Sequence, residues 1–215
     1  MLLSVRPFRE ILQECKPNIN ELLSDVDIKR SKVYKHEADR NRFIAARMLC
    51  FDVLKLRYPM QIPMIFEYSD LGKPALKGVP DFSWSHSGEY VAFFCAQGAG
   101  IDIELFNEID PQSFSSVFTS TQLKWIGTDR KKFFKLWTIK ESVMKSTGLG
   151  FQLNPLELDP IFNSDTHDSW ELHYDKKVFF GKTIIKQVSS SVSQIYAISL
   201  CTIDSSINID KCVLL

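Results

Sequence analysis

Apolar positions recur along this chain with two different periods. Over residues 36–57 they return every three or four positions, which predicts an amphipathic helix ended by Pro59. Residues 64–105 instead contain short apolar runs between turn sequences, which predicts an antiparallel meander of strands. The change of period therefore places a helix before a small sheet in the first half of the chain.

The second half repeats this order. Residues 131–146 have the helical period, and three strand-like runs follow at 170–174, 177–188 and 194–203. We therefore predict an α+β fold of two similar lobes, each a helix packed on a small antiparallel sheet, related by a pseudo-twofold axis. The predicted lobes are residues 1–105 and 106–215, and they meet in a seam near residues 105–115.

Composition narrows the cellular setting. The 215 residues include 26 lysines and arginines against 26 aspartates and glutamates, so the overall charge gives no reason to expect nucleic acid or an anionic membrane as a partner. The five cysteines include no C-x-x-C pair typical of a zinc or redox site. No apolar stretch is long enough to span a bilayer, and the amino terminus lacks the pattern of a secretion signal. We expect a reduced, cytoplasmic protein.

Two acidic residues alternate with apolar ones in Gly100–Leu105. The period of a strand places Asp102 and Glu104 on the same face. Their mutual repulsion is on the order of 3 kcal/mol at an intermediate dielectric constant, and a divalent cation would reverse it. A solvated acidic strand face explains the same pattern, so this motif alone leaves metal binding open.

The predicted helix at 131–146 contains charged residues in and beside its apolar arc. Glu141 and Lys145 are four positions apart at the edge of the arc, where a plain surface ion pair is the simplest interpretation. Lys140 falls within the arc, so its ammonium must reach either water or a carboxylate, and both outcomes fit the sequence. Gly148, just past the last turn, predicts a left-handed helix cap.

Potential phosphate contacts lie at a turn and near the first predicted helix. The turn at Ser85–Gly88 offers hydroxyls, an imidazole and backbone amides, which suit phosphate oxygens, although His86 is also compatible with plain surface. The basic residues could bind a phosphate or form a solvated helix face. They are Lys29, Arg30, Lys32, Arg40, Arg42 and Arg47, with Lys73 further along the chain.

Four motifs in this order resemble the 4'-phosphopantetheinyl transferase family, in its larger, two-lobed, monomeric form. They are Gly72-Lys73-Pro74, Phe82–Ser87 (FSWSHS), Gly100–Glu104 (GIDIE), and Leu136–Ser142 (LWTIKES) with Lys145 and Gly148–Gly150. Each motif is modest by itself, but all four in register between residues 72 and 150 are specific. With the basic helix near Arg42, the resemblance covers most of residues 29–151.

The resemblance implies a set of site residues. Mg²⁺ would be held by Asp102, Glu104 and Glu141, and the catalytic residues would be Glu141, Lys145, Asp102 and His86. The pyrophosphate of coenzyme A would contact Ser85, His86 and Lys145. Its adenine would lie on Leu71, Gly72, Lys73, Pro74, Ala75 and Leu76, and its 3'-phosphate would be neutralised by Lys29 or Lys32 with Arg42 or Arg47.

The resemblance also implies a reaction. The family transfers the 4'-phosphopantetheine group of coenzyme A to a serine hydroxyl of an apo acyl or peptidyl carrier protein and releases 3',5'-ADP. In this chemistry Glu141 would accept the serine proton, and Lys145 would offset the developing negative charge. The apolar residues Phe151 and Leu153 would dock the carrier helix.

Two alternatives stay open. The chain could be a catalytically inactive coenzyme-A-binding regulator or scaffold of carrier domains, although the three carboxylates and Lys145 are all present. It could also be an unrelated α+β domain with chance matches. Gln122 departs from the family, which commonly has a glutamate there, and with Thr119 it instead forms the pattern of a helix capping box. Residues 204–215 contain no motif that we can interpret.

Overall fold

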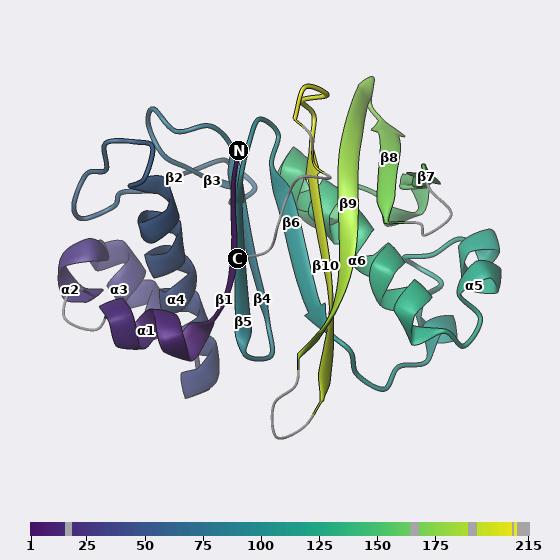
Figure 1. Ribbon diagram of the computed structural model, residues 1–215, viewed down its shortest axis with the longest axis horizontal. Coiled ribbons are helices and arrows are strands. Elements are labelled where there is room, and N and C mark those ends of the chain that lie inside the picture. Colours follow the sequence, from purple (N-terminus) through teal and green to yellow (C-terminus); the bar gives the residue numbers. More distant parts are fainter. Residues whose placement is uncertain (16–18, 164–167, 189–192, 208, 210–215) are drawn as a thin grey trace.

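Two antiparallel sheets stand face to face at the centre of the computed structural model, and helices cover their outer faces (Figure 1). The structure describes every residue except 16–18, 164–167, 189–192, 208 and 210–215. Helices and antiparallel strands are mixed along the chain. The predicted α+β class is therefore confirmed.

The first sheet consists of β1 (Leu2–Pro7), β5 (Tyr90–Cys95) and β4 (Phe82–Ser87), in that order. Alternate residues of β5 point to opposite faces: Phe93 joins the core beneath the helices, whereas Phe94 joins the core between the two sheets. Because both faces of β5 are covered, its apolar residues run without interruption. This explains why the run YVAFFC is so strongly apolar.

A layer of helices covers the outer face of this sheet. The longest of them, α4, packs its buried side chains against Phe82, Val91 and Phe93 of the sheet. A two-stranded ribbon follows α4 in the chain. The helices are α1 (Phe8–Cys15), α2 (Ile19–Leu22), α3 (Asp25–Ser31) and α4 (Glu37–Leu54), and the ribbon consists of β2 (Glu67–Tyr68) and β3 (Pro74–Ala75).

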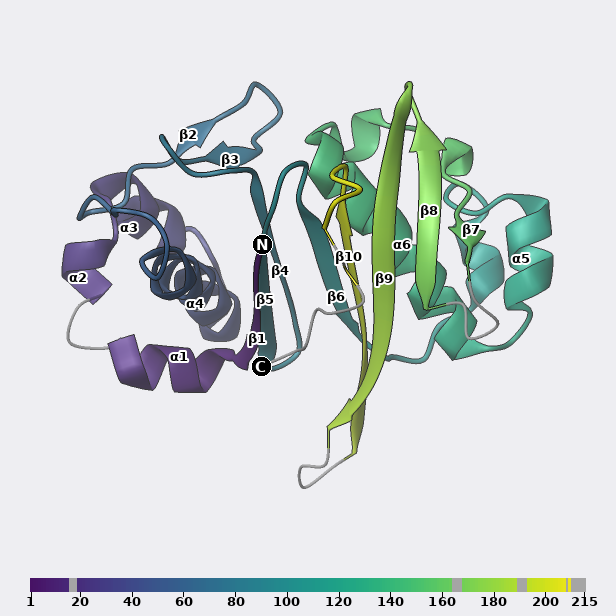
Figure 2. The ribbon, with the colours of Figure 1, turned by 45° about the horizontal axis from the view of Figure 1, so that its top comes forward.

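The second sheet has five strands, and α6 (Arg130–Thr147) lies across its outer face (Figure 2). Helix α6 begins at the capping residue Asp129 and ends at Gly148, whose φ of 73° is the predicted left-handed cap. The strands in spatial order are β6 (Gly100–Leu105), β10 (Gln194–Thr202), β9 (Lys177–Val188), β8 (Ser169–Tyr174) and β7 (Ile161–Phe162). Helix α5 (Ser120–Ile126) and the short 3-10 helices η2 (Pro111–Phe114), η3 (Gly150–Gln152) and η4 (Pro155–Glu157) complete this half.

The predicted meander is wrong at its last strand. β4 and β5 form a hairpin as expected, but β1, which the sequence did not indicate, occupies the free edge of β5. Strand β6 therefore pairs with β10 instead, with Asp102 opposite Ser199. The domain boundary at residue 105 and the pseudo-twofold axis stay predictions, although β6 precedes that boundary and pairs with a strand beyond it.

The sequence also predicted that no segment spans a membrane and that the cysteines are reduced. Within the described part of the chain, no helix has both the length and the apolar character needed to cross a bilayer. The described cysteines, Cys15, Cys50, Cys95 and Cys201, are buried free thiols, and Cys212 lies outside the described residues. Cys50, Cys95 and Cys201 pack in apolar cores, so they behave as small hydrophobic residues.

A buried ion pair holds α3 against α4. Arg47 is 3% exposed, and its Nε donates to Asp27 Oδ1 at 2.8 Å; Asp27 is 2% exposed. Ser24 Oγ donates to the other Asp27 oxygen at 2.9 Å. The Arg47 guanidinium also lies 3.4 Å from the centroid of the Phe43 ring. Both charges are removed from water, so each depends on the other for compensation.

We predict that Arg47→Ala lowers the free energy of unfolding by about 3–5 kcal/mol, because it leaves the Asp27 carboxylate buried and unpaired. Urea unfolding measures the change. The control is the double variant Arg47→Met with Asp27→Leu, which removes both charges and should lose much less stability. An equal loss in the two proteins would contradict this account of the pair.

Candidate functional site

The edges of the two sheets meet where β4 lies beside β6, and serine side chains link the two strands. Ser85 Oγ donates to Asp102 Oδ1 at 2.8 Å, and Ser87 Oγ donates to Glu104 Oε2 at 2.9 Å. The Ser87 hydroxyl also accepts the N–H of Leu105 at 3.0 Å. Because both strands have a period of two, two hydroxyls of β4 face two carboxylates of β6.

Helix α6 brings a lysine to the same place. Lys145 Nζ donates to Asp102 Oδ1 at 2.6 Å and to Ser85 Oγ at 2.8 Å. Lys145 thus forms its ion pair with Asp102 of β6. Two strands of the first half, β4 and β6, and a helix of the second half, α6, therefore converge on one carboxylate, and Glu141 lies one helical turn before Lys145.

The three carboxylates influence one another electrostatically. Asp102 is 2% exposed, and its Oδ2 has no hydrogen-bond partner among the described residues. Burial, with the charge of Asp102, raises the pKa of Glu104 to about 7. Burial raises the pKa of Glu141 as well, and the charge of Asp102 adds to the effect. The site therefore holds negative charge that Lys145 only partly compensates.

The described residues fit a hard divalent cation without already enclosing one. No three His, Cys, Asp or Glu side chains within the described ranges surround a common point closely enough to act as metal ligands as they stand. Carboxylate oxygens are nevertheless the ligands that Mg²⁺ prefers. A buried carboxylate oxygen without a partner raises the free energy of the folded protein when no cation is bound. Asp102 Oδ2, Glu104 and Glu141 are the residues that would hold such an ion.

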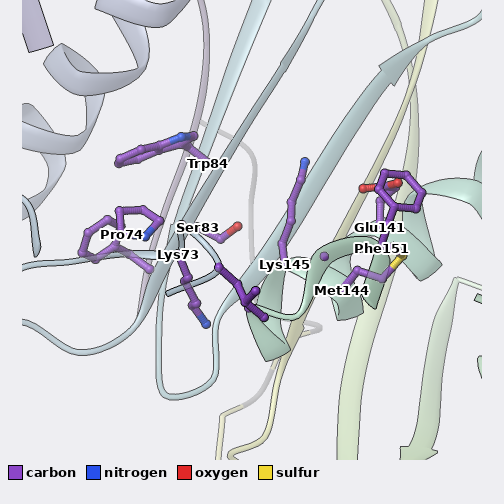
Figure 3. A pocket seen from close by; sticks show the side chains of 13 residues that line it. Lys73, Pro74, Ser83, Trp84, Glu141, Met144, Lys145 and Phe151 are labelled. Carbon is purple, nitrogen blue, oxygen red and sulfur yellow. The ribbon is translucent and has the colours of Figure 1, made fainter. Parts of the chain in front are cut away.

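A cavity of about 240 Å³ opens beside these groups. One wall comes from the first half of the chain and includes Pro74 and Trp84; the other comes from α6 and the following turn and includes Glu141 and Phe151 (Figure 3). Lys145 stands between the two walls. An apolar cleft with a few charged groups at one end is typical of a small-molecule site.

A second, smaller cavity of about 130 Å³ shares Gly72, Pro74 and Trp84 with the first. Its lining combines Arg30, Arg47 and His86 with aromatic rings. The Arg30 guanidinium lies 5.6 Å from the centroid of the Tyr68 ring. Positive charge over aromatic surfaces suits a phosphate next to an aromatic ring system.

The basic residues predicted for a phosphate are only partly at these cavities. Lys29 and Lys32 are exposed and line neither described cavity, whereas their neighbour Arg30 does. Sequence reasoning placed Arg30 in the basic set without singling it out. Sequence reasoning missed Tyr68 and gave no role to Trp84, although Trp84 belongs to the motif FSWSHS; the aromatic content of the two strands was the available signal.

Arg42 and His86 stand together near the cleft. Arg42 donates to the carbonyl of Gly88 at 3.0 Å and pairs with Asp39 at 2.5 Å. The His86 ring keeps solvent-exposed surface, although protein atoms surround it on several sides. This partial desolvation lowers the pKa of His86, and the charges of Arg42 and Lys145 lower it further. The imidazole is therefore more often neutral here than in free histidine.

The residues predicted to contact the adenine or the carrier are only partly accessible at the cavity. Leu71, Gly72, Lys73 and Pro74 line the larger cavity, whereas Ala75 and Leu76 do not. Phe151 also lines it and is 73% exposed. Leu153, in contrast, is 0% exposed in the core beneath α6, so its side chain is not available to a carrier and that part of the prediction is wrong.

Two polar residues of the motif region have structural partners. Lys140 is buried, and its ammonium donates to the carbonyls of Val117 at 3.0 Å and Pro155 at 2.6 Å. It reaches neither of the partners that the sequence suggested, and burial lowers its pKa to about 8. Gln122 forms the predicted capping box with Thr119 and donates to the carbonyl of Leu158 at 3.1 Å.

Comparisons with known proteins agree with the motifs. The family model of the 4'-phosphopantetheinyl transferase superfamily matches residues 98–201. The chain is 29% identical over 158 residues to the 4'-phosphopantetheinyl transferase Sfp of Bacillus subtilis strain 168, which covers 69% of this chain and 70% of that protein. It is 32% identical over 123 residues to the 4'-phosphopantetheinyl transferase gsp of Aneurinibacillus migulanus, covering 51% of each.

A further relative is also similar. The phosphopantetheinyl transferase of Thraustochytrium is 24% identical over 155 residues, covering 60% of this chain and 53% of that protein. The chain thus spans about half the length of some curated relatives and 70% of the first.

We predict that Asp102→Asn lowers the pKa of Glu104 from about 7, because one neighbouring negative charge is lost while the burial of Glu104 remains. NMR titration of the glutamate side-chain carboxyl carbons in metal-free protein measures the shift. The matched control is Asp81→Asn, which changes a carboxylate that accepts the backbone N–H of Gly98 instead. This control should leave the titration midpoint of Glu104 unchanged. An unchanged midpoint in Asp102→Asn would contradict the coupling.

Proposed function

The chain belongs to the 4'-phosphopantetheinyl transferase superfamily, and we propose that it moves the 4'-phosphopantetheine group of coenzyme A to a serine hydroxyl of an apo carrier protein, releasing 3',5'-ADP. The observation that supports this most is the convergence of Ser85, Asp102 and Lys145 at the end of an apolar cleft. A cation, a hydroxyl and unneutralised carboxylates at one end of a cleft suit a diphosphate with its metal ion.

Coenzyme A fits this site with its adenine in the larger cavity, against Leu71–Pro74. In this arrangement the pyrophosphate lies toward Ser85, His86 and Lys145. The 3'-phosphate lies toward the smaller cavity, where the exposed Arg30 has its guanidinium 5.6 Å from the centroid of the Tyr68 ring. Arg42, beside His86, is the second candidate for that phosphate, because its partner Asp39 is partly exposed, whereas Arg47 is buried together with its partner Asp27.

The residues of the chain then act by positioning and charge compensation. Mg²⁺, held by Asp102, Glu104 and Glu141, would neutralise the pyrophosphate oxygens. Lys145 donates to the phosphate oxygen that gains charge as 3',5'-ADP departs. Glu141 accepts the proton of the attacking serine.

The carrier protein approaches from the open side of the cleft. Phe151 is a large apolar residue exposed there, and it follows directly on the glycine after the α6 cap. An apolar anchor at the mouth of the cleft suits a slender carrier helix, whose serine must reach the phosphorus. We propose that the protein is a cytoplasmic monomer that needs no nucleic acid or membrane partner.

The test of this function is a mass measurement. Purified apo carriers of the acyl and peptidyl types are incubated with the protein, coenzyme A and Mg²⁺, and each is weighed. We expect one or more carriers to gain the mass of phosphopantetheine. Coenzyme A binding without any mass gain over the whole panel would favour the regulator or scaffold, in which binding survives without transfer.

We predict that Glu141→Gln slows transfer by about 10²–10⁴-fold, because it removes both a general base and a metal ligand. The Mn²⁺ affinity of the variant, measured by paramagnetic resonance, should fall as well. The control Glu21→Gln, on the exposed surface of α2, should alter neither quantity. Unchanged transfer by Glu141→Gln would exclude this residue from the reaction.

We predict that Phe151→Asp raises the KM for the carrier on the order of tenfold, the effect of losing a typical apolar interface anchor. The KM for coenzyme A should rise less, since Phe151 forms only part of the cleft wall. The control is Ile161→Asp on β7, which is 53% exposed. Equal increases in both KM values for Phe151→Asp would refute a docking role.

A further inference from the structure

We propose that Lys73 is a positioning residue whose ammonium caps the carboxyl end of α6 and so fixes one wall of the cleft against the helix that bears Glu141 and Lys145. The sequence motif had assigned Lys73 to coenzyme A itself. The geometry points to a bond within the protein instead: Lys73 Nζ donates to the backbone carbonyl of Ser146 at 2.5 Å. The consequence for coenzyme A rests on the proposed function, whereas the cap itself does not.

The end of α6 needs such a partner. The last four carbonyls of a helix have no intrahelical donor, and they form the negative end of the helix dipole. Ser146 is the last residue but one of α6, so its carbonyl belongs to this group. A partly buried ammonium from the other half of the chain satisfies the carbonyl and compensates the dipole at once. Partial burial lowers the pKa of Lys73, which agrees with a side chain packed against protein atoms.

The side chain reaches this carbonyl because Gly148 leaves room for it. A Cβ atom on Gly148 would lie 3.0 Å from Lys73 Cδ and 3.2 Å from Lys73 Cβ. Gly148 also has a φ of 73°, so a glycine at this position serves both the left-handed cap and the passage of the lysine stem. In Figure 3 the Lys73 ammonium points away from that of Lys145, on which the proposed phosphate site is centred.

The bond acts on the cleft through a tight turn. Within residues 69–73, Ser69 N–H donates to Lys73 O at 3.0 Å, and Gly72 N–H donates to Ser69 O at 2.8 Å. Lys73 N–H also donates to Ser69 Oγ at 3.0 Å. Since the turn is closed on itself, anchoring Lys73 also anchors Leu71 and Pro74, which line the cleft on either side of it. The ribbon containing this turn lies on the side of α6 where the helix ends (Figure 2).

A cap and a direct phosphate contact make different predictions for the free protein. We measure amide hydrogen exchange without ligand in the wild type, Lys73→Met and Lys73→Arg. If Lys73 is a cap, Lys73→Met speeds exchange about tenfold or more in residues 69–75 and in the last turn of α6, as the loss of a charge-assisted hydrogen bond does. Lys73→Arg keeps a donor and restores much of the protection. The control Lys77→Met removes an exposed lysine just beyond β3 and leaves exchange unchanged.

Unchanged exchange in Lys73→Met would overturn the proposal. A second measurement compares the affinities of coenzyme A and 3'-dephospho-coenzyme A. A cap weakens both by the same factor in Lys73→Met, because the cleft wall moves and no phosphate contact is lost. A larger loss for coenzyme A than for its dephospho form would also overturn it, since the ammonium would then contact the 3'-phosphate. If the wild type bound neither compound, the proposed function would fail, and the exchange data would still decide on the cap.

Discussion

The ion pair between Lys145 and Asp102 is the contact on which the site depends. It joins α6 to β6, and Ser85 of β4 donates to the same carboxylate oxygen. A carboxylate as buried as Asp102 is costly unless it is paired and hydrogen-bonded. The two halves of the chain must therefore fold onto each other before this carboxylate is stable. The cleft, whose walls come one from each half, forms as a consequence.

The arrangement compensates one oxygen of Asp102 and leaves the other without a described partner. Nearby, burial and the charge of Asp102 keep Glu104 and Glu141 easier to protonate than ordinary glutamates. Such a site is stable enough to fold, yet it would gain from a cation. Lys73 complements Lys145: one lysine at the end of α6 faces the carboxylates, and the other closes the helix behind them.

Local patterns in the sequence predicted the elements whose contacts are regular along the chain. Helix α6 follows its three- and four-residue period, and β9 spans the residues that its apolar run indicated. Helix α4 forms where a helix was predicted, but it is buried on all sides over residues 45–50, so its predicted amphipathic character is wrong. The motifs also placed Asp102, Glu141 and Lys145, since strand and helix periods fix which side chains share a face. Their meeting across two halves came only from the family resemblance.

Such local patterns could not predict which segments that are distant in sequence pair with each other. Strand β1 lies more than eighty residues from β5 in sequence, and nothing in its short apolar run names its partner. A helix turns by about 100° per residue, so the choice of Arg30 over Lys29 requires the position of α3 on its neighbours. Phe151, within the 3-10 helix η3, is exposed, and Leu153, the extended residue that follows this helix, is buried, which depends on how the segment packs beneath α6. Lys140 finds two carbonyls from separate loops, which no local pattern could indicate.

The most direct test of the central claim is the anomalous diffraction of crystals grown with coenzyme A and Mn²⁺, a scatterer that can replace Mg²⁺. The account predicts a manganese peak bounded by Asp102 Oδ2 and the carboxylates of Glu104 and Glu141, with the diphosphate on its open side. Bound coenzyme A with the manganese peak elsewhere, or with Glu141 turned away from it, would contradict the account.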